Sequence, residues 1–308
     1  MSATLVGAAT TRSAAQVRGY ALVAGSYVIF GAIGALVNYA TAPESLLLVL
    51  RFGTASVVLT LFFARRKTFA QYRRPGIAAR MVLMGILDTG ALICFFIALR
   101  ETGVAAGMFL FFTGPVFVAL LAPRLAKQPT DRVVWPSLAL ALAGLAAILM
   151  PGLTGSATHF SALGVGFGVA GAVIWAFFMM VVKSLTHSVS SQAIVLGECW
   201  MDCIFMLPLA LWQTIGDGYS LTSHDVISGV ILGIVCTALA YWIFVVGLHH
   251  IRVQHASILG YLEPVTAPLY ALVLLGERPA AWTLGGGALI LVAGVLVVRF
   301  GKPEEVPA

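Results

Sequence analysis

The stretch from residue 79 to residue 122 reads ARMVLMGILDTGALICFFIALRETGVAAGMFLFFTGPVFVALLA, and it decides the fold class. It holds two apolar runs, 79–99 and 104–122, which are separated only by Arg100-Glu101-Thr102-Gly103. A helix that spans a membrane needs about 20 predominantly apolar residues. Each run has about that length, so the stretch predicts two antiparallel membrane helices joined by a tight turn.

The same pattern continues along the chain of 308 residues, where apolar runs alternate with turns rich in proline, glycine and charged residues. The first run follows Arg12 and Arg18, and it is longer than the apolar stretch of about 7–15 residues in a signal peptide, so we expect an uncleaved first helix. The sequence predicts an all-α integral membrane protein. Its ten transmembrane helices are expected near residues 19–38, 45–64, 79–99, 104–122, 133–150, 161–182, 191–213, 226–247, 254–275 and 282–299.

Composition excludes a water-soluble protein. Hydrophobic residues make up 60% of the chain and charged residues 10%, whereas soluble domains carry about 25% charged residues. The net charge of +6 does not indicate nucleic-acid binding, because the basic residues fall in short gaps between apolar runs. The four cysteines all lie within apolar runs, where we expect small buried packing residues rather than disulfides or zinc ligands.

The positions of the basic residues predict the orientation. Of the 18 Lys and Arg residues, all except Arg51, Arg100 and Arg278 fall in alternate segments, beginning with the N-terminal one. Segments rich in Lys and Arg remain in the cytoplasm. We therefore expect a multi-pass protein of the plasma membrane, the inner membrane of a bacterium, with both termini in the cytoplasm.

An internal repeat relates the two halves of the chain. Pro115 and Pro264 coincide when the second half is shifted by 149 residues onto the first. Five spans per half is an odd number, so residues 1–150 and 151–308 are predicted to form two inverted five-helix repeats around a central cavity. The matched prolines predict interrupted helices with free carbonyls at Phe111 and Gly260, although a simple packing kink is the alternative.

Several short patterns, taken together over nearly the whole chain, resemble the EamA family of the drug/metabolite transporter superfamily. They are residues 262–268 followed by Leu275-Gly276-Glu277, residues 43–50 leading into Arg51-Phe52, and residues 238–242. Lys127 departs from the pattern, because the family often has a glutamate there. Within the family, the chain is most similar to YddG-type exporters of aromatic and other amino acids.

The resemblance implies export of amino acids, or of similar small metabolites, by alternating access between the two halves. A drug, sugar or nucleobase carrier of the same fold is the alternative. A membrane-embedded enzyme is the rival from another class, but the predicted spans contain no Ser/His/Asp, HExxH or paired-His arrangement. A receptor or scaffold would normally carry sizeable domains outside the membrane, and the predicted spans leave no room for them.

Charged side chains inside the predicted spans are candidate functional groups, since each costs about 2.5–3.5 kcal/mol or more in the membrane interior. Asp202 and Glu263 fall near the midplane, and Glu198 shares one helical face with Asp202. The acids could bind a proton or a substrate's ammonium group, while Arg51 could attract a carboxylate or pair with Glu44. Structural ion pairs or hydrogen-bonded acids are the alternative. The candidates for ion or proton coupling are Arg51, Asp88, Glu198 and Asp202.

Aromatic residues flank the two matched prolines and lie on neighbouring spans. Apolar walls with a few polar tips suit ligands that carry a ring or an aliphatic side chain, although ordinary packing or lipid contact is the alternative. The predicted substrate-binding positions are Phe109, Phe112, Pro115, Trp175, Tyr241, Tyr261, Glu263 and Pro264.

Cofactor and metal sites are not predicted. Residues 166–171 match the letters of a dinucleotide-binding fingerprint, but they lie inside an apolar span rather than in a βαβ unit, so close helix packing explains them. His249, His250 and His255 are expected to face water at the cytoplasmic end rather than to hold a metal. The expected partners are a small-molecule substrate and membrane lipid. The oligomeric state stays open, and a monomer is compatible with the sequence.

Overall fold

The computed structural model describes residues 13–154, 161–216, 218–276 and 280–302, so Arg12 and the predicted turn at Glu277, Arg278 and Pro279 lie outside the described residues. All regular elements within these ranges are helical. In chain order they are α1 (Ala14–Phe30), α2 (Ala32–Tyr39), α3 (Glu44–Phe63), α4 (Arg66–Tyr72), α5 (Ile77–Thr102), α6 (Val104–Phe111), α7 (Gly114–Leu125), α8 (Val134–Leu153), α9 (Ala162–Thr186), α10 (Ser191–Gly216), α11 (Ser223–Ile231), the π-helix η1 (Leu232–Leu239), α12 (Ala240–Leu248), α13 (Val253–Leu259), α14 (Leu262–Leu275) and α15 (Ala281–Phe300).

Ten helical spans among the described residues are long and apolar enough to cross a membrane, which confirms the predicted number. Four of them join more than one helix: α1 with α2, α6 with α7, α11 with η1 and α12, and α13 with α14. The predicted tight turn between the third and fourth spans is also present. Gly103 forms it alone with a φ of +84°, a conformation that favours glycine because it has no Cβ.

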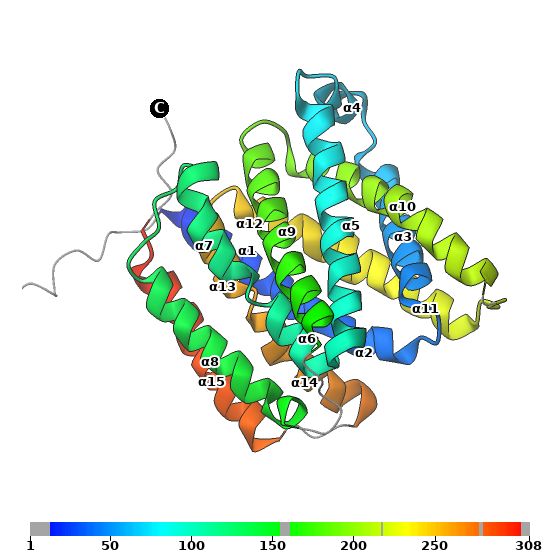
Figure 1. Cartoon of the computed structure of the whole chain (residues 1–308). Coiled ribbons are helices and arrows are strands. Elements are labelled where there is room, and N and C mark those ends of the chain that lie inside the picture. The colour runs from blue at the N-terminus through cyan, green and yellow to red at the C-terminus, as the bar shows by residue number, and fades with distance from the viewer. Residues whose placement is uncertain (1–12, 155–160, 217, 277–279, 303–308) are drawn as a thin grey trace, which may run out of the picture.

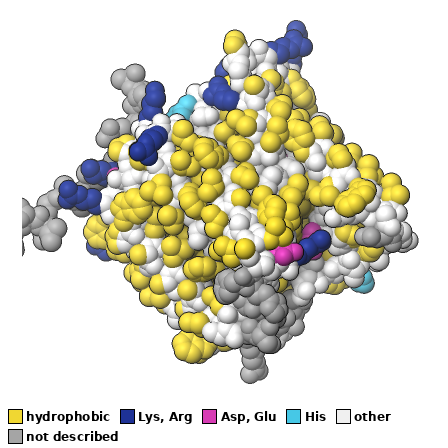
Figure 2. Space-filling view, in the orientation of Figure 1, with side chains coloured by type: hydrophobic (Ala, Val, Ile, Leu, Met, Phe, Trp, Pro, Cys, Tyr) yellow, Lys and Arg dark blue, Asp and Glu magenta, His cyan; other side chains and the backbone are white. Residues whose placement is uncertain are grey.

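The outer surface of the helical bundle is apolar. Leu61, Ile215 and Val273 each leave more than three quarters of their area exposed. Figure 2 shows hydrophobic side chains over the broad face of the molecule, with Lys and Arg gathered toward its edges. A continuous apolar surface of this size suits contact with lipid rather than water.

The helices pack in pairs that are preserved when the two halves of the chain are exchanged. In Figure 1, α1 crosses α12 and α9 lies against α5, while α3 packs on α10 and α8 packs on α15. In span order, the first packs on the eighth and the sixth on the third, while the second packs on the seventh and the fifth on the tenth. This pairing is what an inverted repeat requires, and the repeat boundaries at 1–150 and 151–308 remain a proposal.

The fourth and ninth spans are both interrupted near the matched prolines, as predicted. The helix breaks after Phe111 and begins again at Gly114, and the ninth span breaks after Leu259 and begins again at Leu262. The two breaks therefore lie at equivalent places in the two halves.

Pro115 and Pro264 lie in the first turn of the second helix of each interrupted span, rather than inside a continuous helix. First-turn N–H groups have no partner within the helix, so a proline is tolerated there without losing a hydrogen bond. The predicted free carbonyl at Gly260 is wrong, because this oxygen accepts a hydrogen bond from the amide of Glu263 at 3.1 Å.

Candidate functional site

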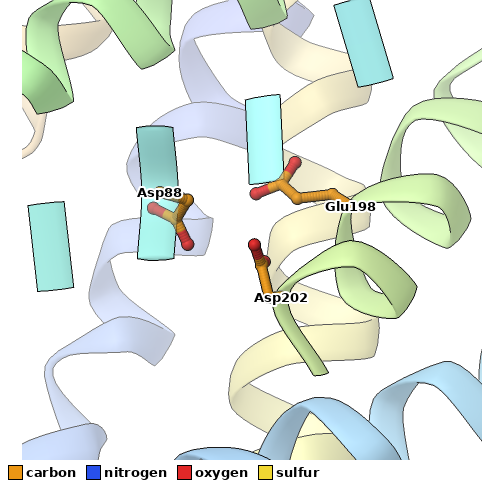
Figure 3. A group of neighbouring side chains, drawn as sticks. All are labelled: Asp88, Glu198 and Asp202. Atoms are coloured by element: carbon orange, nitrogen blue, oxygen red, sulfur yellow. The ribbon is translucent and has the colours of Figure 1, made fainter. Parts of the chain in front are cut away.

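Three acidic side chains from two helices meet inside the bundle. Asp88 lies on α5, and Glu198 and Asp202 lie one turn apart on α10. One carboxylate oxygen from each residue lies within 4.8 Å of those of the other two. Figure 3 shows the three carboxylates facing a common space. Glu198 and Asp202 are buried, whereas Asp88 is half-buried. We call these three residues the acidic triad.

The close approach of α5 and α10 brings the triad together. Gly85 lies one turn before Asp88, and a Cβ added to Gly85 would collide with the side chain of Met201, the neighbour of Asp202. Glycine at this crossing allows the two backbones to come close, as small residues do between membrane helices. The four-residue spacing on α10 brings the other two members together, because it places Glu198 and Asp202 on one face of the helix.

The members of the triad have unequal hydrogen-bonding partners. The Tyr241 hydroxyl on α12 donates a short hydrogen bond to Oε2 of Glu198. The Asp88 carboxyl is a side-chain hydrogen-bonding neighbour of Asp202. Outside the triad, neither carboxylate oxygen of Asp202 has a hydrogen-bond partner among the described residues, although the side chain is completely buried. A buried carboxylate without a partner is costly, so the space in front of Asp202 is chemically incomplete.

Arg51 supplies positive charge from the facing helix α3. Its Nε donates to Oγ1 of Thr237 at 2.6 Å, and its charge acts on Asp88 and Asp202. Pairing with Glu44, one of the options that the sequence left open for Arg51, is wrong. Glu44, in the first turn of α3, instead pairs with Arg100 at the end of α5 at 2.7 Å, because both side chains are exposed at the same end of the bundle.

The π-helix η1 and the helix that follows it carry the hydrogen-bond partners of Arg51 and Glu198. Thr237 lies within it and donates to the carbonyl of Leu232 at 3.0 Å, while Tyr241 follows in α12. A Cβ added to Gly233 would lie 2.6 Å from the carbonyl oxygen of Arg51, so η1 runs directly against α3. Stretches of π-helix occur frequently at functional sites. Sequence reasoning missed this element, and we find no sequence signal that would have revealed it.

The aromatic residues around the two helix breaks mainly hold the breaks together. Tyr261 is fully buried, and its hydroxyl donates to the carbonyl of Phe112 at 2.6 Å. Phe109 packs against the main core, and the Trp175 ring lies where a Cβ on Gly114 would need space. Of the aromatic candidates, Tyr241 is the one that hydrogen-bonds to the triad.

Glu263 does not join the acidic triad. It lies in the first turn of α14, where it is half-buried and acts electrostatically on Arg51 and on Tyr27 of α1. The sequence placed Glu263 and Asp202 at a similar depth, and equal depth does not bring side chains of different helices together. Asp88 occupies the place beside Asp202 instead.

A second buried network lies at the predicted cytoplasmic end. Asp131, between α7 and α8, binds Arg252 through Oδ1 at 2.9 Å and His255 through Oδ2 at 3.1 Å. Oδ2 also accepts from the amide of Lys302 at 2.6 Å, and the Tyr20 hydroxyl lies 2.7 Å from Nδ1 of His255. The prediction that His255 faces water is wrong, because these partners enclose its ring completely.

Two groups at this end have shifted pKa values. Burial alone would raise the pKa of Asp131, but hydrogen bonds from His255 and the Lys302 amide, with the charge of Arg252, hold it below the ordinary value. Burial, followed by the positive charge of Lys183 and other neighbours, lowers the pKa of His249 to about 4. The Lys183 ammonium donates to the carbonyls of Leu248 and Ile251 at 2.6 and 2.9 Å.

Two cavities approach the charged site from opposite ends of the bundle. One has a volume of about 450 Å³ and opens between α4 and the start of α10, at the predicted cytoplasmic end. Its wall includes Phe63, whose ring packs against Trp242, the neighbour of Tyr241. A smaller pocket at the opposite end contains Glu44 and Arg51. Neither of these two cavities is lined by a residue of the triad.

Comparison with known proteins gives a consistent result. A family model described as the EamA-like transporter family matches residues 17–150 and again residues 162–300. The uncharacterized transporter YxxF of Bacillus subtilis (strain 168) is 26% identical, over 90% of this chain and 89% of its own. The threonine/homoserine exporter RhtA of Escherichia coli (strain K12) is 25% identical, over 82% of this chain and 79% of its own.

A solved crystal structure shares the fold. It superposes with a TM-score of 0.76 at 19% sequence identity, and the match covers 95% of this chain and 100% of that chain. Ten spans in the described residues and two family matches agree with the all-helical membrane architecture predicted from the sequence.

Proposed function

Because the chain belongs to the EamA-like transporter family, we propose that it exports amino acids or similar small metabolites by alternating access. The chain is a multi-pass membrane transporter and not an enzyme. The identity of the cargo, the direction of transport and the division into inverted repeats belong to the proposal. So do the location in the inner membrane and the cytoplasmic position of both termini, which the distribution of Lys and Arg supports.

The observation that carries the proposal is the presence of both charge types at one place between the halves. The acidic triad offers three carboxylate oxygens within 4.8 Å of one another, and an ammonium group has three N–H donors. Arg51 offers a planar guanidinium, which suits a carboxylate. A free amino acid carries one group of each kind, so a zwitterion matches the charges better than a sugar or a nucleobase does.

The related exporter supports the same class of cargo. RhtA carries threonine and homoserine in its name, and it matches most of both chains. Aromatic amino acids remain part of the proposal because aromatic residues connect the larger cavity with the triad. Phe63 lines the cavity and packs against Trp242, and the adjacent Tyr241 hydrogen-bonds to Glu198. In the proposed cycle, the cargo enters from the 450 Å³ cavity, passes these rings and reaches the triad and Arg51 before the opposite end opens.

The test is transport of radiolabelled threonine and phenylalanine by the purified protein in liposomes, with and without a pH gradient. We expect saturable movement that unlabelled amino acids compete away. Arg51→Gln should abolish most of this transport, because the carboxylate of the cargo loses the guanidinium that binds it. Arg100→Gln is the matched control, since Arg100 is exposed and pairs with Glu44. Movement no faster than in protein-free liposomes, with the protein shown to be folded, would refute amino-acid export.

A further inference from the structure

We infer that the acidic triad binds a bare inorganic cation of the size of Na⁺ or Ca²⁺. The inference rests on the arrangement of Asp88, Glu198 and Asp202, which offer hard oxygen ligands from two packed helices. Carboxylate oxygens are the ligands that hard cations prefer. Sequence analysis predicted no metal site because the three acids are not contiguous, and Asp88 reaches the other two only through the crossing of α5 and α10.

The spacing of the oxygens is compatible with an ion of this size. Ca²⁺ binds oxygens at about 2.3–2.6 Å, so three ligands spaced evenly around it lie about 4.0–4.5 Å apart. Na⁺ has nearly the same ionic radius. The three triad oxygens all lie within 4.8 Å of one another, and this limit includes the separations that such an ion requires. Mg²⁺ gives up its bound waters reluctantly and usually keeps several of them, so a closed site made of carboxylates suits it less.

The burial of Asp202 supplies the second, independent observation. Both of its carboxylate oxygens are inaccessible and have no hydrogen-bond partner outside the triad among the described residues, and its side chain points toward the other two acids. Removing a carboxylate from water costs several kcal/mol unless a charge or donor compensates it. A cation placed between the three carboxylates would give both Asp202 and its neighbours a partner.

The groups around the triad carry less positive charge than three carboxylates can balance. Facing it are Arg51 from α3, Tyr241 from α12, and Cys199 and Cys203 on α10 itself. Of these groups Arg51 is the one that is positive, and its Nε is already engaged by Thr237. When they are ionised, three carboxylates facing one guanidinium carry a net negative charge, which attracts a cation in the low-dielectric interior of a membrane protein.

Binding of the ion would compete with the proposed binding of the cargo. The same carboxylates are proposed to receive the ammonium group of the cargo, so ion and cargo would exclude each other from one site. In that respect the inference rests on the proposed function, but cation binding itself does not require the cargo to be known. The test below therefore uses the metal alone.

The experiment measures thermal unfolding of the purified full-length protein in detergent, in NaCl, CaCl₂ or MgCl₂, against choline chloride at matched ionic strength. We expect a saturable rise in Tm with Na⁺ or with Ca²⁺ and a weaker one with Mg²⁺. Asp202→Asn should remove the rise, and Glu44→Gln should keep it because Glu44 is an exposed acid paired with Arg100. The salt that raises the Tm identifies the ion.

A second measurement keeps the inference testable if Asp202→Asn does not fold. Binding of ²²Na⁺ or ⁴⁵Ca²⁺ is measured on the wild type and on Asp88→Asn, which changes the half-buried member of the triad. Loss of saturable binding supports the site. Binding that survives in Asp88→Asn and Asp202→Asn would overturn the inference, because the ion would then bind elsewhere. A Tm that follows pH but no metal would overturn it in favour of a shared proton. Either result leaves the threonine and phenylalanine assay unaffected, so the two proposals fail separately.

Discussion

At the scale of single residues, the hydroxyl of Tyr241 is the neutral donor that satisfies Glu198. The two groups come from different helices, α12 and α10, and both lie in the interior of the bundle. Removing one partner of a buried hydrogen bond costs the desolvation of the group left behind, about 1–3 kcal/mol and more where that group is charged.

We therefore expect Tyr241→Phe to lower the free energy of unfolding by about 1–3 kcal/mol, because the Glu198 carboxylate loses its donor while the ring stays in place. Thermal or denaturant unfolding in detergent measures the change. Tyr39→Phe is the control, since Tyr39 is 48% exposed and its described contact is an edge-on packing against His224. Equal stability of the two variants would show that the Tyr241 hydroxyl contributes nothing.

Sequence could predict part of this site. The spacing of Glu198 and Asp202 predicted that they share a face, and their proximity confirms it. The contribution of Asp88 could not be predicted, because it depends on which helices cross and where. The same holds for the contact of Asp131 with His255, which are 124 residues apart, since no periodic pattern encodes a distant partner.

At the scale of helices, the crossing of α8 and α15 shows how glycine permits close packing. A Cβ on Gly144 would lie 2.6 Å from the carbonyl oxygen of Gly286, and a Cβ on Gly286 would lie 2.9 Å from the amide nitrogen of Ile148. Backbone atoms cannot move aside as the end of a side chain can. The neighbouring Gly285, by contrast, faces open space.

Gly286→Ala and Gly285→Ala form a matched pair on one helix. We expect Gly286→Ala to destabilise the protein by about 1–3 kcal/mol, because the added methyl group forces α8 and α15 apart. Gly285→Ala should be neutral or stabilising by up to about 1 kcal/mol, because alanine favours the helix. Unfolding temperatures of the two variants in the same detergent measure this. A fall of the same size in both would argue against the close crossing.

Apolar periodicity and turn residues predicted the number and approximate limits of the spans, because these depend on local sequence alone. The repeat-matched prolines, Pro115 and Pro264, also predicted where two spans are interrupted. The π-helix in the eighth span was not predicted. It packs against α3 and contains Thr237, which hydrogen-bonds to Arg51 and to Leu232, and an apolar sequence does not reveal these contacts.

At the scale of the whole molecule, the network around Asp131 joins segments far apart in the chain. Tyr20 lies on α1, Asp131 precedes α8, Arg252 and His255 start the ninth span, and Lys302 follows α15. The network thus connects both halves at the predicted cytoplasmic end. Its charge balance depends on the ionised carboxylate of Asp131.

We expect stability to fall in acid through Asp131. Its pKa in the folded protein is lower than the ordinary value of about 3.9, so the folded state binds fewer protons than the unfolded state. The contribution is therefore complete above about pH 4–5 and is lost as pH falls through the lowered pKa. Asp131→Asn should be less stable than the wild type at neutral pH and should show a flatter response below pH 4, measured as Tm against pH.

His249 affects stability over a different pH range, which allows its effect to be separated from that of Asp131. Its pKa falls from the ordinary value of 6.5 to about 4, so the unfolded state takes up a proton first. Stability should decrease between about pH 6.5 and pH 4, and His249→Asn should remove that part while the loss below pH 4 remains. A wild-type Tm that is flat from pH 7 to pH 3 would contradict both assignments.

The hydrogen bond between Tyr261 and Phe112 has a mechanical consequence. The two residues are 149 positions apart, the offset of the proposed repeat, so equivalent points of the two halves touch each other there. Equivalent points of two related bodies meet only near their symmetry axis, and points near a rotation axis travel least when one body rocks against the other. The contact therefore lies where a pivot between the two halves would lie, and it would hold while the ends of the bundle open and close in turn.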